Sequence, residues 1–187
     1  KETSSVRNQI CVSRSFSYPI DSLKELNQVI IKFVLIASAK LRKYNQLSSA
    51  ITIFTTTNTY SKDFYKSEST EKIDIPTSDS RIMIKKSLEL TKKIFKPYRK
   101  LKKAGVILHK LQSDKYKQKL LFNEKFIQNE FNRERLNFII DEINNKSDRD
   151  KINWGSSMIK KEWGTRREKL SSIKTTDIES IPIIYAN

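Results

Sequence analysis

Residues 22–57 read SLKELNQVIIKFVLIASAKLRKYNQLSSAITIFTTT, and this stretch contains the two patterns that decide the fold. Between Leu23 and Leu41, apolar residues recur every three or four positions, which places them along one face of an amphipathic helix. Ser49–Thr57 is mostly β-branched or aromatic, as is typical of a β-strand. We therefore predict a long helix that runs to about residue 44, with a strand shortly after it.

Further strand and helix patterns flank this central stretch. On its N-terminal side, Asn8–Phe16 has the alternation of a strand. On its C-terminal side, a short strand over Glu71–Ile75 ends at Pro76 and leads into a second amphipathic helix that ends at Pro97, and Ala104–Leu111 follows as a final strand. The predicted class is α+β, a ferredoxin-like split βαβ fold in the order βαββαβ. Such a fold is a four-stranded antiparallel sheet with two helices on one face, so its other face is left uncovered.

Both helices have recognisable first turns. Ser22 and Glu25 have the spacing of a capping box at the start of the first helix. Thr77 or Ser78 is predicted to cap the second helix, where Asp79 is favoured by the helix dipole.

The pattern changes after residue 112, which divides the chain into three parts. We expect residues 1–112 to form the folded domain and residues 113–131, which are polar and lysine-rich, to form a flexible linker. Residues 132–187 are predicted to be a mostly helical or irregular tail. Within this tail, Arg135–Asn144 carries apolar residues at helical spacing, namely Leu136, Ile139, Ile140 and Ile143.

Composition points to a polyanionic partner. The 187 residues include 37 Lys+Arg and 21 Asp+Glu, for a formal net charge of +16. AT-rich coding bias is an alternative explanation of the lysine content, so the positions of the charges have to decide. The single cysteine, Cys11, lies in an apolar run and is expected to be a small buried residue in a reducing cytosol. The longest apolar stretch, Phe33–Ala39, is too short to span a bilayer, so no membrane partner is expected, and the single thiol fits a cytoplasmic location.

Four motifs occur in one order along the chain. They are VSRSF at residues 12–16, IDIPTSDSR at residues 73–81, YRKLKKAGVIL at residues 98–108, and EWGTRREKLS at residues 162–171 with a later Thr-Thr and Ile-Pro. This succession resembles the C-terminal half of UmuC-type Y-family translesion DNA polymerases, which consists of a little finger domain and a C-terminal tail. The likeness runs from about Asn8 to Pro182.

The resemblance implies a part of a DNA polymerase that does not itself catalyse. In this family, palm carboxylates hold the two catalytic metal ions, and these carboxylates lie in the N-terminal half of the polymerase. The chain begins after that half, at Lys1, which indicates the cut end of a longer protein. We therefore assign no catalytic residue, no metal ligand and no cofactor, and expect Mg²⁺ only in the absent palm domain. Asp141 and Glu142 are adjacent on a predicted helix, so they point in different directions and are expected to be solvated.

The resemblance also implies a DNA-binding surface on the uncovered face of the sheet, where backbone phosphates of primer–template DNA would be held without reading bases. The predicted DNA-binding residues are Ser13, Arg14, Ser15, Thr55, Thr56, Thr57, Asn58, Arg81, Arg99, Lys100, Lys102 and Lys103. The family commonly has a cation near position 56, where this chain has Thr56. The threonine run is equally well explained by β-propensity alone.

A short peptide after the last predicted strand is similar to the bacterial sliding-clamp motif Q-x-x-L-F. Its residues are Gln118, Lys119, Leu120, Leu121 and Phe122. In this interpretation the leucine and phenylalanine side chains fill an apolar pocket on the clamp and the glutamine hydrogen-bonds at its rim. The alternative is an apolar patch that folds back on its own domain.

The tail carries Trp163, Arg166 and Arg167, which are residue types favoured at interfaces. By resemblance, the tail would contact a UmuD-type subunit and a recombinase filament. Packing of Trp163 in a small local core is the alternative, and the two arginines are open between these roles.

Two other functions fit the same strand and helix order. One is a free-standing RNA-binding module, which needs aromatic residues on its third strand, and Glu71–Ile75 contains none. The other is a protein-interaction module, or the remnant of a decayed polymerase gene. Binding to primed DNA with a loaded clamp would separate these functions.

Overall fold

The structure is a computed structural model that describes residues 8–114, 124–146, 152 and 155. Its elements follow one another as β1 (Ile10–Ile20), α1 (Leu23–Lys43), β2 (Gln46–Thr56), β3 (Lys66–Thr77), α2 (Ser80–Ile94), β4 (Leu101–Ser113) and α3 (Glu124–Asn145). The first six confirm the predicted βαββαβ order and the α+β class. None of the described helices has the length and hydropathy needed to cross a bilayer.

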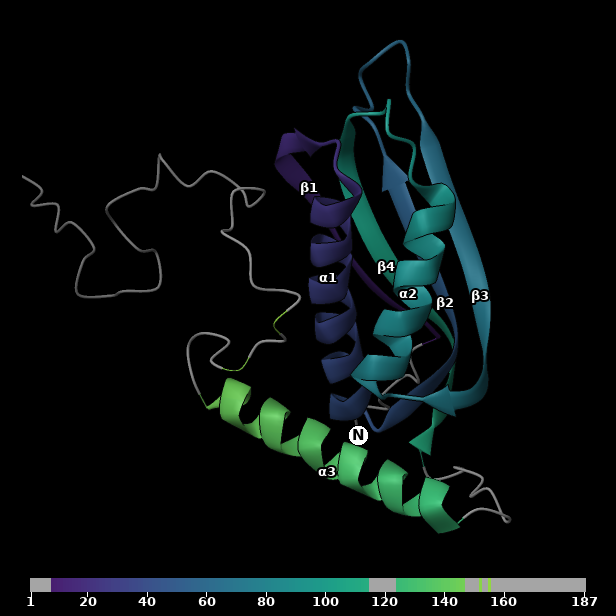
Figure 1. Ribbon diagram of the computed structural model, residues 1–187, viewed down its shortest axis with the longest axis vertical. Helices are drawn as coiled ribbons and strands as arrows, with labels where there is room; N and C mark the ends of the chain where they lie inside the picture. Colours follow the sequence, from purple (N-terminus) through teal and green to yellow (C-terminus); the bar gives the residue numbers. More distant parts are fainter. Residues whose placement is uncertain (1–7, 115–123, 147–151, 153–154, 156–187) are drawn as a thin grey trace, which may run out of the picture.

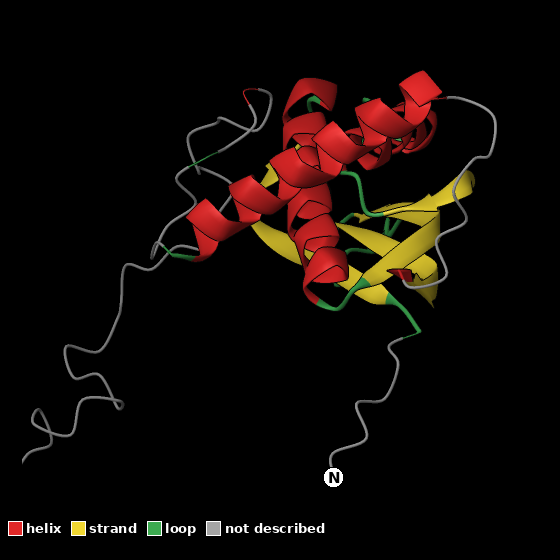
Figure 2. Cartoon of the chain, turned by 90° about the horizontal axis from the view of Figure 1, so that it is seen from below, coloured by secondary structure: helices red, strands yellow, loops and turns green. Residues whose placement is uncertain are grey.

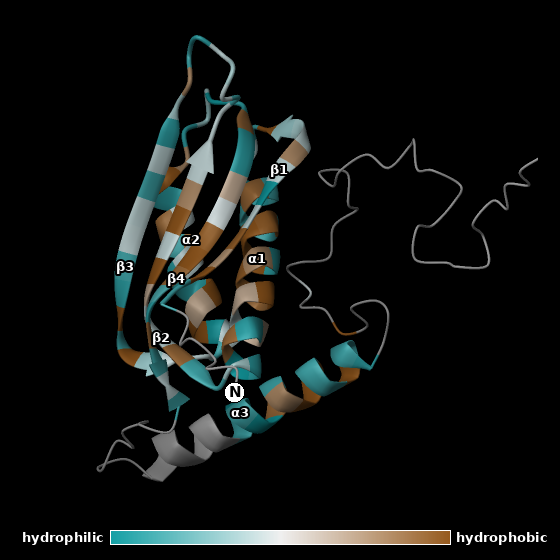
Figure 3. Ribbon diagram, turned by 180° about the vertical axis from the view of Figure 1, so that it is seen from behind, coloured by the Kyte–Doolittle hydropathy of each residue, from teal (hydrophilic) through white to brown (hydrophobic). Residues whose placement is uncertain are grey.

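The four strands form one antiparallel sheet in the order β1-β4-β2-β3. Each βαβ unit is split by a strand of the other, because β4 lies between β1 and β2, and β2 lies between β3 and β4. Helices α1 and α2 pack side by side on one face of the sheet (Figures 1 and 2). No described helix covers the opposite face (Figure 3). We call that opposite surface the open face.

The hydrophobic core lies between the sheet and these two helices. The predicted stripe of α1 is buried at Leu26, Ile30, Phe33, Ala37 and Leu41. Burying one such side chain stabilises the fold by about 1.5–3 kcal/mol, so this helix is held mainly by its apolar face. In α2 the buried leucine is Leu90, whereas Leu88 is only half-buried.

The helix caps differ from the predictions. Ser22 occupies the N-cap position of α1, but its hydroxyl makes no capping bond, so the predicted capping box is wrong. The cap of α2 is Asp79 rather than Thr77 or Ser78. Its Oδ1 accepts a hydrogen bond from the backbone N–H of Arg81 at 2.8 Å, and the Thr77 hydroxyl instead accepts from the backbone N–H of Asp79 at 3.0 Å.

Strand β3 begins five residues before its predicted start. Its first half is polar and exposed on alternate residues, and it lies at the edge of the sheet beside β2. The carboxylate of Glu71 ties this edge to α2 through a hydrogen bond from Lys86, and Lys93 lies 3.8 Å away. That hydrogen bond holds the pKa of Glu71 below its ordinary value and raises the pKa of Lys86.

Helix α3 lies across the end of the domain where α1 finishes (Figures 1 and 2). The Arg42 guanidinium of α1 donates hydrogen bonds to both carboxylate oxygens of Asp141, from Nε to Oδ2 at 2.5 Å and from Nη2 to Oδ1 at 2.8 Å. Asn137 is buried in the same contact, with 4% of its surface exposed. The helix therefore docks through polar side chains, and its apolar residues Leu136, Ile139 and Ile143 are exposed.

Candidate nucleic-acid interface

Strand register assigns fifteen residues to the open face, because directly paired residues point to the same side of a sheet. The buried residues Ala104, Val106 and Leu108 of β4 mark the opposite, helix-covered side. The open face consists of Cys11, Ser13 and Ser15 of β1, Lys103, Gly105, Ile107 and His109 of β4, Ala50, Thr52, Phe54 and Thr56 of β2, and Lys66, Glu68, Thr70 and Lys72 of β3. Hydroxyl and ammonium groups dominate this surface, with Glu68 its one acid.

One row of residues crosses all four strands at the end of the sheet where β2 finishes. Ser15 pairs with Lys103, Lys103 with Thr56, and Thr56 with Lys66. We call these four residues the basic row. All but the half-buried Thr56 are exposed. Three strand spacings of about 4.8 Å give the row a length of about 14 Å.

Lys66 in this row also pairs with Glu68, with 2.7 Å between Nζ and Oε2. Both side chains are more than half exposed, at 53% and 56%. An ion pair at such an exposed site contributes little stability, about 0–1 kcal/mol. Lys66 can therefore leave Glu68 and bind another anion with little loss of stability.

More cations lie in and beside the loop that leads into β4, next to the basic row. The Arg99 guanidinium lies 5.1 Å from the centre of the Tyr65 ring, beside the loop that joins β2 to β3. Lys100 is exposed in the same loop. Lys102 instead donates a hydrogen bond to the Ser17 carbonyl of β1 at 2.9 Å, so its ammonium is committed to the protein.

The side chains in the middle of the open face are hydrogen-bonded to one another. Thr52 Oγ1 lies 2.7 Å from the hydroxyl of Thr70 and 2.8 Å from Nε2 of His109. The Phe54 ring lies over Gly105, where a Cβ atom would come within 2.4 Å of the ring. Glycine is required here by space, since its φ is not positive. Hydroxyl groups on a surface of this kind can contact a nucleic-acid backbone without reading its bases.

A family model described as "impB/mucB/samB family C-terminal domain" matches residues 7–121, which is more than half of the chain. The chain belongs to the impB/mucB/samB family. A second model, described as a domain of unknown function (DUF4113), matches residues 134–184. The family assignment confirms the resemblance that the motifs indicate.

Named relatives agree with this assignment. The chain is 32% identical over 185 residues to Protein MucB of Escherichia coli and 25% identical over 178 residues to Protein UmuC of Salmonella typhimurium. It covers 43% of the first and 42% of the second, so it spans less than half the length of these family members. A solved complex of a β-clamp processivity factor and the little finger domain of PolIV is similar over 62% of this chain and 99% of that one, at 14% identity and a TM-score of 0.43.

The predicted DNA-binding residues of this family member fall into two groups. Ser13, Ser15, Thr56 and Lys103 lie on the open face, with Arg99 and Lys100 in the adjoining loop. Asn58 is exposed in the loop after β2, where its side-chain oxygen accepts from the Tyr60 N–H at 3.2 Å.

The other predicted contacts lie away from the open face, and Lys102 is one of them because it alternates with the open-face residue Lys103 along β4. Thr55 is 0% exposed on the helix-covered side. Thr57 is 8% exposed and closes the β2–β3 loop through Tyr65, whose N–H it accepts at 2.8 Å. Strand alternation puts Arg14 on the helix side of β1, and Arg81 lies in the first turn of α2, 3.7 Å from its capping Asp79. Consecutive residues of a strand alternate between faces, so neither run, 13–15 nor 55–57, can present every side chain to one ligand.

Phe54, Lys66 and Lys72 are among the open-face residues that were not predicted as DNA contacts from the sequence. Lys66 was overlooked because residues 66–70 did not have the apolar content of a strand, whereas Lys72 lies inside the predicted strand Glu71–Ile75 and was not predicted as a contact. The available signal was the polar alternation of KSESTEK at residues 66–72 beside a strongly β-forming partner. Cys11 is exposed on the same face, so the prediction of a buried thiol is wrong.

Acidic residues of the described ranges form no metal site. Among the described residues there is no group of three or more His, Cys, Asp or Glu side chains that could hold a metal ion. Asp141 is paired with Arg42 and Glu142 with Lys146 at 2.6 Å, so Asp141 is not the solvated carboxylate that we expected.

The peptide 118–122 and the residues Trp163, Arg166 and Arg167 lie outside the described residues.

Proposed function

We propose that this chain is the duplex-holding part of an error-prone translesion DNA polymerase that serves SOS mutagenesis, working on the nucleoid in the cytoplasm. Its open face would lie along the backbone of primer–template DNA. The observation that carries this proposal is the basic row, which aligns two ammonium groups and two hydroxyl groups on a surface that no described helix covers. Membership of the impB/mucB/samB family supports it.

The chemistry of the basic row suits phosphate more than bases. Lys66 and Lys103 offer point charges to phosphate oxygens, while Ser15 and Thr56 offer hydroxyl donors. A sheet face presents no helix to the major groove, where base edges are read. Contacts of this kind position a duplex without reading its sequence, which is what copying of damaged templates requires.

We assign no step of nucleotide transfer to the described residues. The Mg²⁺ ions of polymerase chemistry need clustered carboxylates, and the described residues do not provide them. Asp141 and Glu142 are both engaged with cations of the protein. In our proposal this chain contributes binding, and the carboxylates belong to a palm domain outside it.

The test is the salt dependence of DNA binding by the 187-residue chain. Fluorescence anisotropy with primed duplexes of different sequences should give similar affinities that fall as salt rises. Four engaged cations, at Lys66, Arg99, Lys100 and Lys103, predict a log–log slope of about −3.6, since each contributes about 0.9. Salt-independent binding would overturn the proposal, and nucleotide incorporation by the purified chain would contradict its non-catalytic part.

A second candidate, single-stranded RNA binding, is favoured by one observation. Phe54 presents an aromatic ring on a central strand of the open face. A base stacked on the Phe54 ring would contribute about 1–3 kcal/mol to binding. RNA-recognition sheets stack two or three bases on their aromatic side chains, so this single ring would supply less. The same anisotropy assay with single-stranded RNA decides between the two, because binding to RNA alone would displace the duplex proposal.

We also propose that residues 118–122 dock on the sliding clamp. This stretch follows shortly after β4, which runs from the basic row to the opposite end of the sheet. Ser113 is ten residue steps along β4 from Lys103, and a strand of that length spans about 33 Å. The clamp and the DNA backbone would therefore be engaged at opposite ends of the domain, and clamp tethering would raise the effective concentration at the primer end.

Replacing both Leu121 and Phe122 with alanine should abolish pull-down by the clamp, because these side chains fill the apolar pocket in our proposal. The DNA affinity of the same variant should stay unchanged. Lys119→Ala is the matched control, since the motif leaves this position unspecified, and it should retain clamp binding. Equal pull-down of the double variant and the control would remove the docking proposal.

Contacts of Trp163, Arg166 and Arg167 with a UmuD-type subunit or a recombinase filament remain further proposals from the resemblance.

A further inference from the structure

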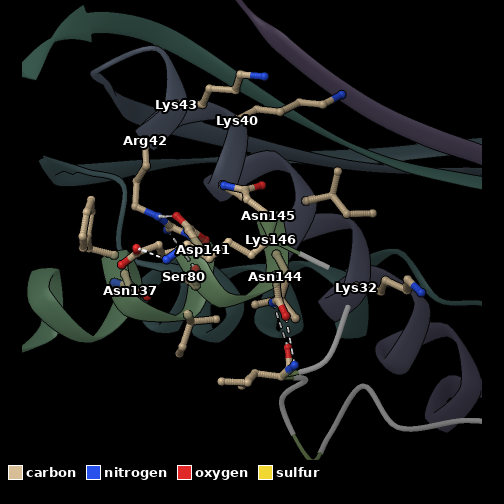
Figure 4. A pocket seen from close by; sticks show the side chains of 17 residues that line it. Lys32, Lys40, Arg42, Lys43, Ser80, Asn137, Asp141, Asn144, Asn145 and Lys146 are labelled. Carbon is tan, nitrogen blue, oxygen red and sulfur yellow. Dashed lines mark hydrogen bonds and ion pairs between the residues drawn. The ribbon is translucent and has the colours of Figure 1, made fainter. Parts of the chain in front are cut away.

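A groove of about 720 Å³ lies between the outer side of α1 and the C-terminal half of α3 (Figure 4). Its walls include the apolar side chains of Leu35, Ile36 and Ala39 from α1 and of Phe138 and Ile140 from α3. Phe138 is 66% exposed, and Ile36 is 37% exposed. The groove thus exposes apolar surface from two different elements that face one another.

Cations surround this apolar surface. Lys32, Lys40 and Lys43 of α1 line the groove (Figure 4). Its two acids, Asp141 and Glu142, are already paired with Arg42 and Lys146, which line the same groove. These two pairs cancel in charge, and Lys40 and Lys43 leave the groove positively charged, so the fitting occupant is an apolar segment that carries carboxylates.

The chain that follows α3 returns to this groove. The Asn144 side chain holds the backbone of Ile152 at two points, since its Oδ1 accepts the Ile152 N–H at 2.9 Å and its Nδ2 donates to the Ile152 carbonyl at 3.0 Å (Figure 4). Ile152 itself lines the groove. The part of the chain beyond residue 152 therefore starts at the groove.

One segment of that remaining sequence has the matching chemistry. Residues 175–187, TTDIESIPIIYAN, include Asp177 and Glu179, several isoleucines and no Lys or Arg, in a chain whose net charge is +16. The domain model of unknown function matches residues 134–184, so it includes both the groove-forming half of α3 and most of this segment.

We propose that residues 175–187 bind in the α1/α3 groove of their own chain. The isoleucine side chains would cover the apolar walls, and the carboxylates of Asp177 and Glu179 would face the lysines of α1. The connection is long enough, because 22 residues separate Ile152 from residue 175 and span about 26 Å even as a random coil. Tethering at this length gives an effective concentration of about millimolar, so a weak intrinsic affinity is sufficient.

Disulfide trapping in the full-length chain tests this proposal. In a Cys11→Ser background, one cysteine replaces Ile36 in the groove and a second replaces Ile181, Ile183 or Ile184 in turn. At high dilution in a glutathione buffer, at least one pair should form an intramolecular disulfide about tenfold more than its control. In the matched control, the first cysteine replaces Lys85 instead of Ile36. Lys85 is an exposed residue of α2 that does not line the groove.

Charge exchange tests the same pairing. Lys40→Glu with Lys43→Glu should lower trapping several-fold, and adding Asp177→Lys with Glu179→Lys should restore it. Equal trapping at Ile36 and Lys85 would show that the segment has no preferred site and would overturn the proposal. Disulfides formed only between chains would place the segment on a second copy and would also overturn it.

A measurement without cysteines covers the case in which Ile36→Cys disturbs folding. Asp177→Lys with Glu179→Lys in the otherwise natural chain should speed amide hydrogen exchange in residues 138–146, because the groove loses its occupant. Exchange in the sheet should not change. Unchanged exchange in residues 138–146 would contradict the proposal.

Discussion

Replacing Arg42 with methionine should release α3 from the domain while the sheet and its two covering helices stay folded. The Arg42 guanidinium bonds both oxygens of Asp141, the Ser78 carbonyl at 2.7 Å and the Ser80 hydroxyl at 3.1 Å. Only 17% of its side chain and 21% of the Asp141 side chain are exposed. Removing one partner of a fully buried pair costs about 3–5 kcal/mol, and this partly exposed pair should cost about 2–3 kcal/mol.

Hydrogen exchange resolved by segment measures this effect. Amides of α3 should exchange at least tenfold faster in Arg42→Met, whereas amides of β2 and β4 should keep their protection. The double variant Arg42→Met with Asp141→Leu should recover part of the lost protection, because no unpaired charge then remains at the contact. Equal exchange in α3 before and after the substitution would show that other contacts hold this helix.

The sequence predicts the α1 and β2 parts of the fold well because local spacing alone decides them. The α1 stripe from Leu26 to Leu41 has helical spacing and is buried as predicted. The start of β3 was missed because its residues are polar, and it forms as a strand by pairing with β2, a contact that local propensity does not include.

The docking of α3 could not be predicted for a related reason. Arg42 and Asp141 are 99 residues apart, so no local pattern connects them. The apolar spacing of Leu136, Ile139 and Ile143 indicated a helix, but it did not indicate which face of that helix meets the domain. In the structure they are exposed, and the polar residues Asn137 and Asp141 face the domain.

The sequence motifs pointed to the strands that form the candidate interface, but only some of the residues they named lie on the open face. A motif names consecutive residues, while a strand divides them between two faces. Thr56 lies on the open face between Lys103 and Lys66, and its neighbour Thr55 is buried. Thr56 carries no charge, and Lys66 supplies a cation on the adjacent strand, directly paired with Thr56.

The two ends of the domain should respond independently to substitution. The basic row is at the end where β4 begins, and the α1/α3 groove is at the end where α1 finishes (Figure 1). Sites this far apart, with no shared partners, usually have additive effects. DNA affinity should therefore be insensitive to Arg42→Met. This variant tests the α3 contact, and substitutions in the basic row test the open face.

Reversing the two lysines of the basic row, Lys66→Glu with Lys103→Glu, should lower the affinity for primed duplex about 100-fold. Each reversal removes one phosphate contact and adds a repulsive charge, so the log–log salt slope should become shallower by about 1.8. The matched control is Lys85→Glu with Lys92→Glu, at two exposed positions of α2 in the helix layer. Each pair changes the net charge from +16 to +12, because every Lys→Glu replacement changes it by two units. Anisotropy titrations of both variants at several salt concentrations therefore separate the open face from overall charge. Equal losses in the two variants would mean that DNA is held by the net charge of the chain and not by this face of the sheet.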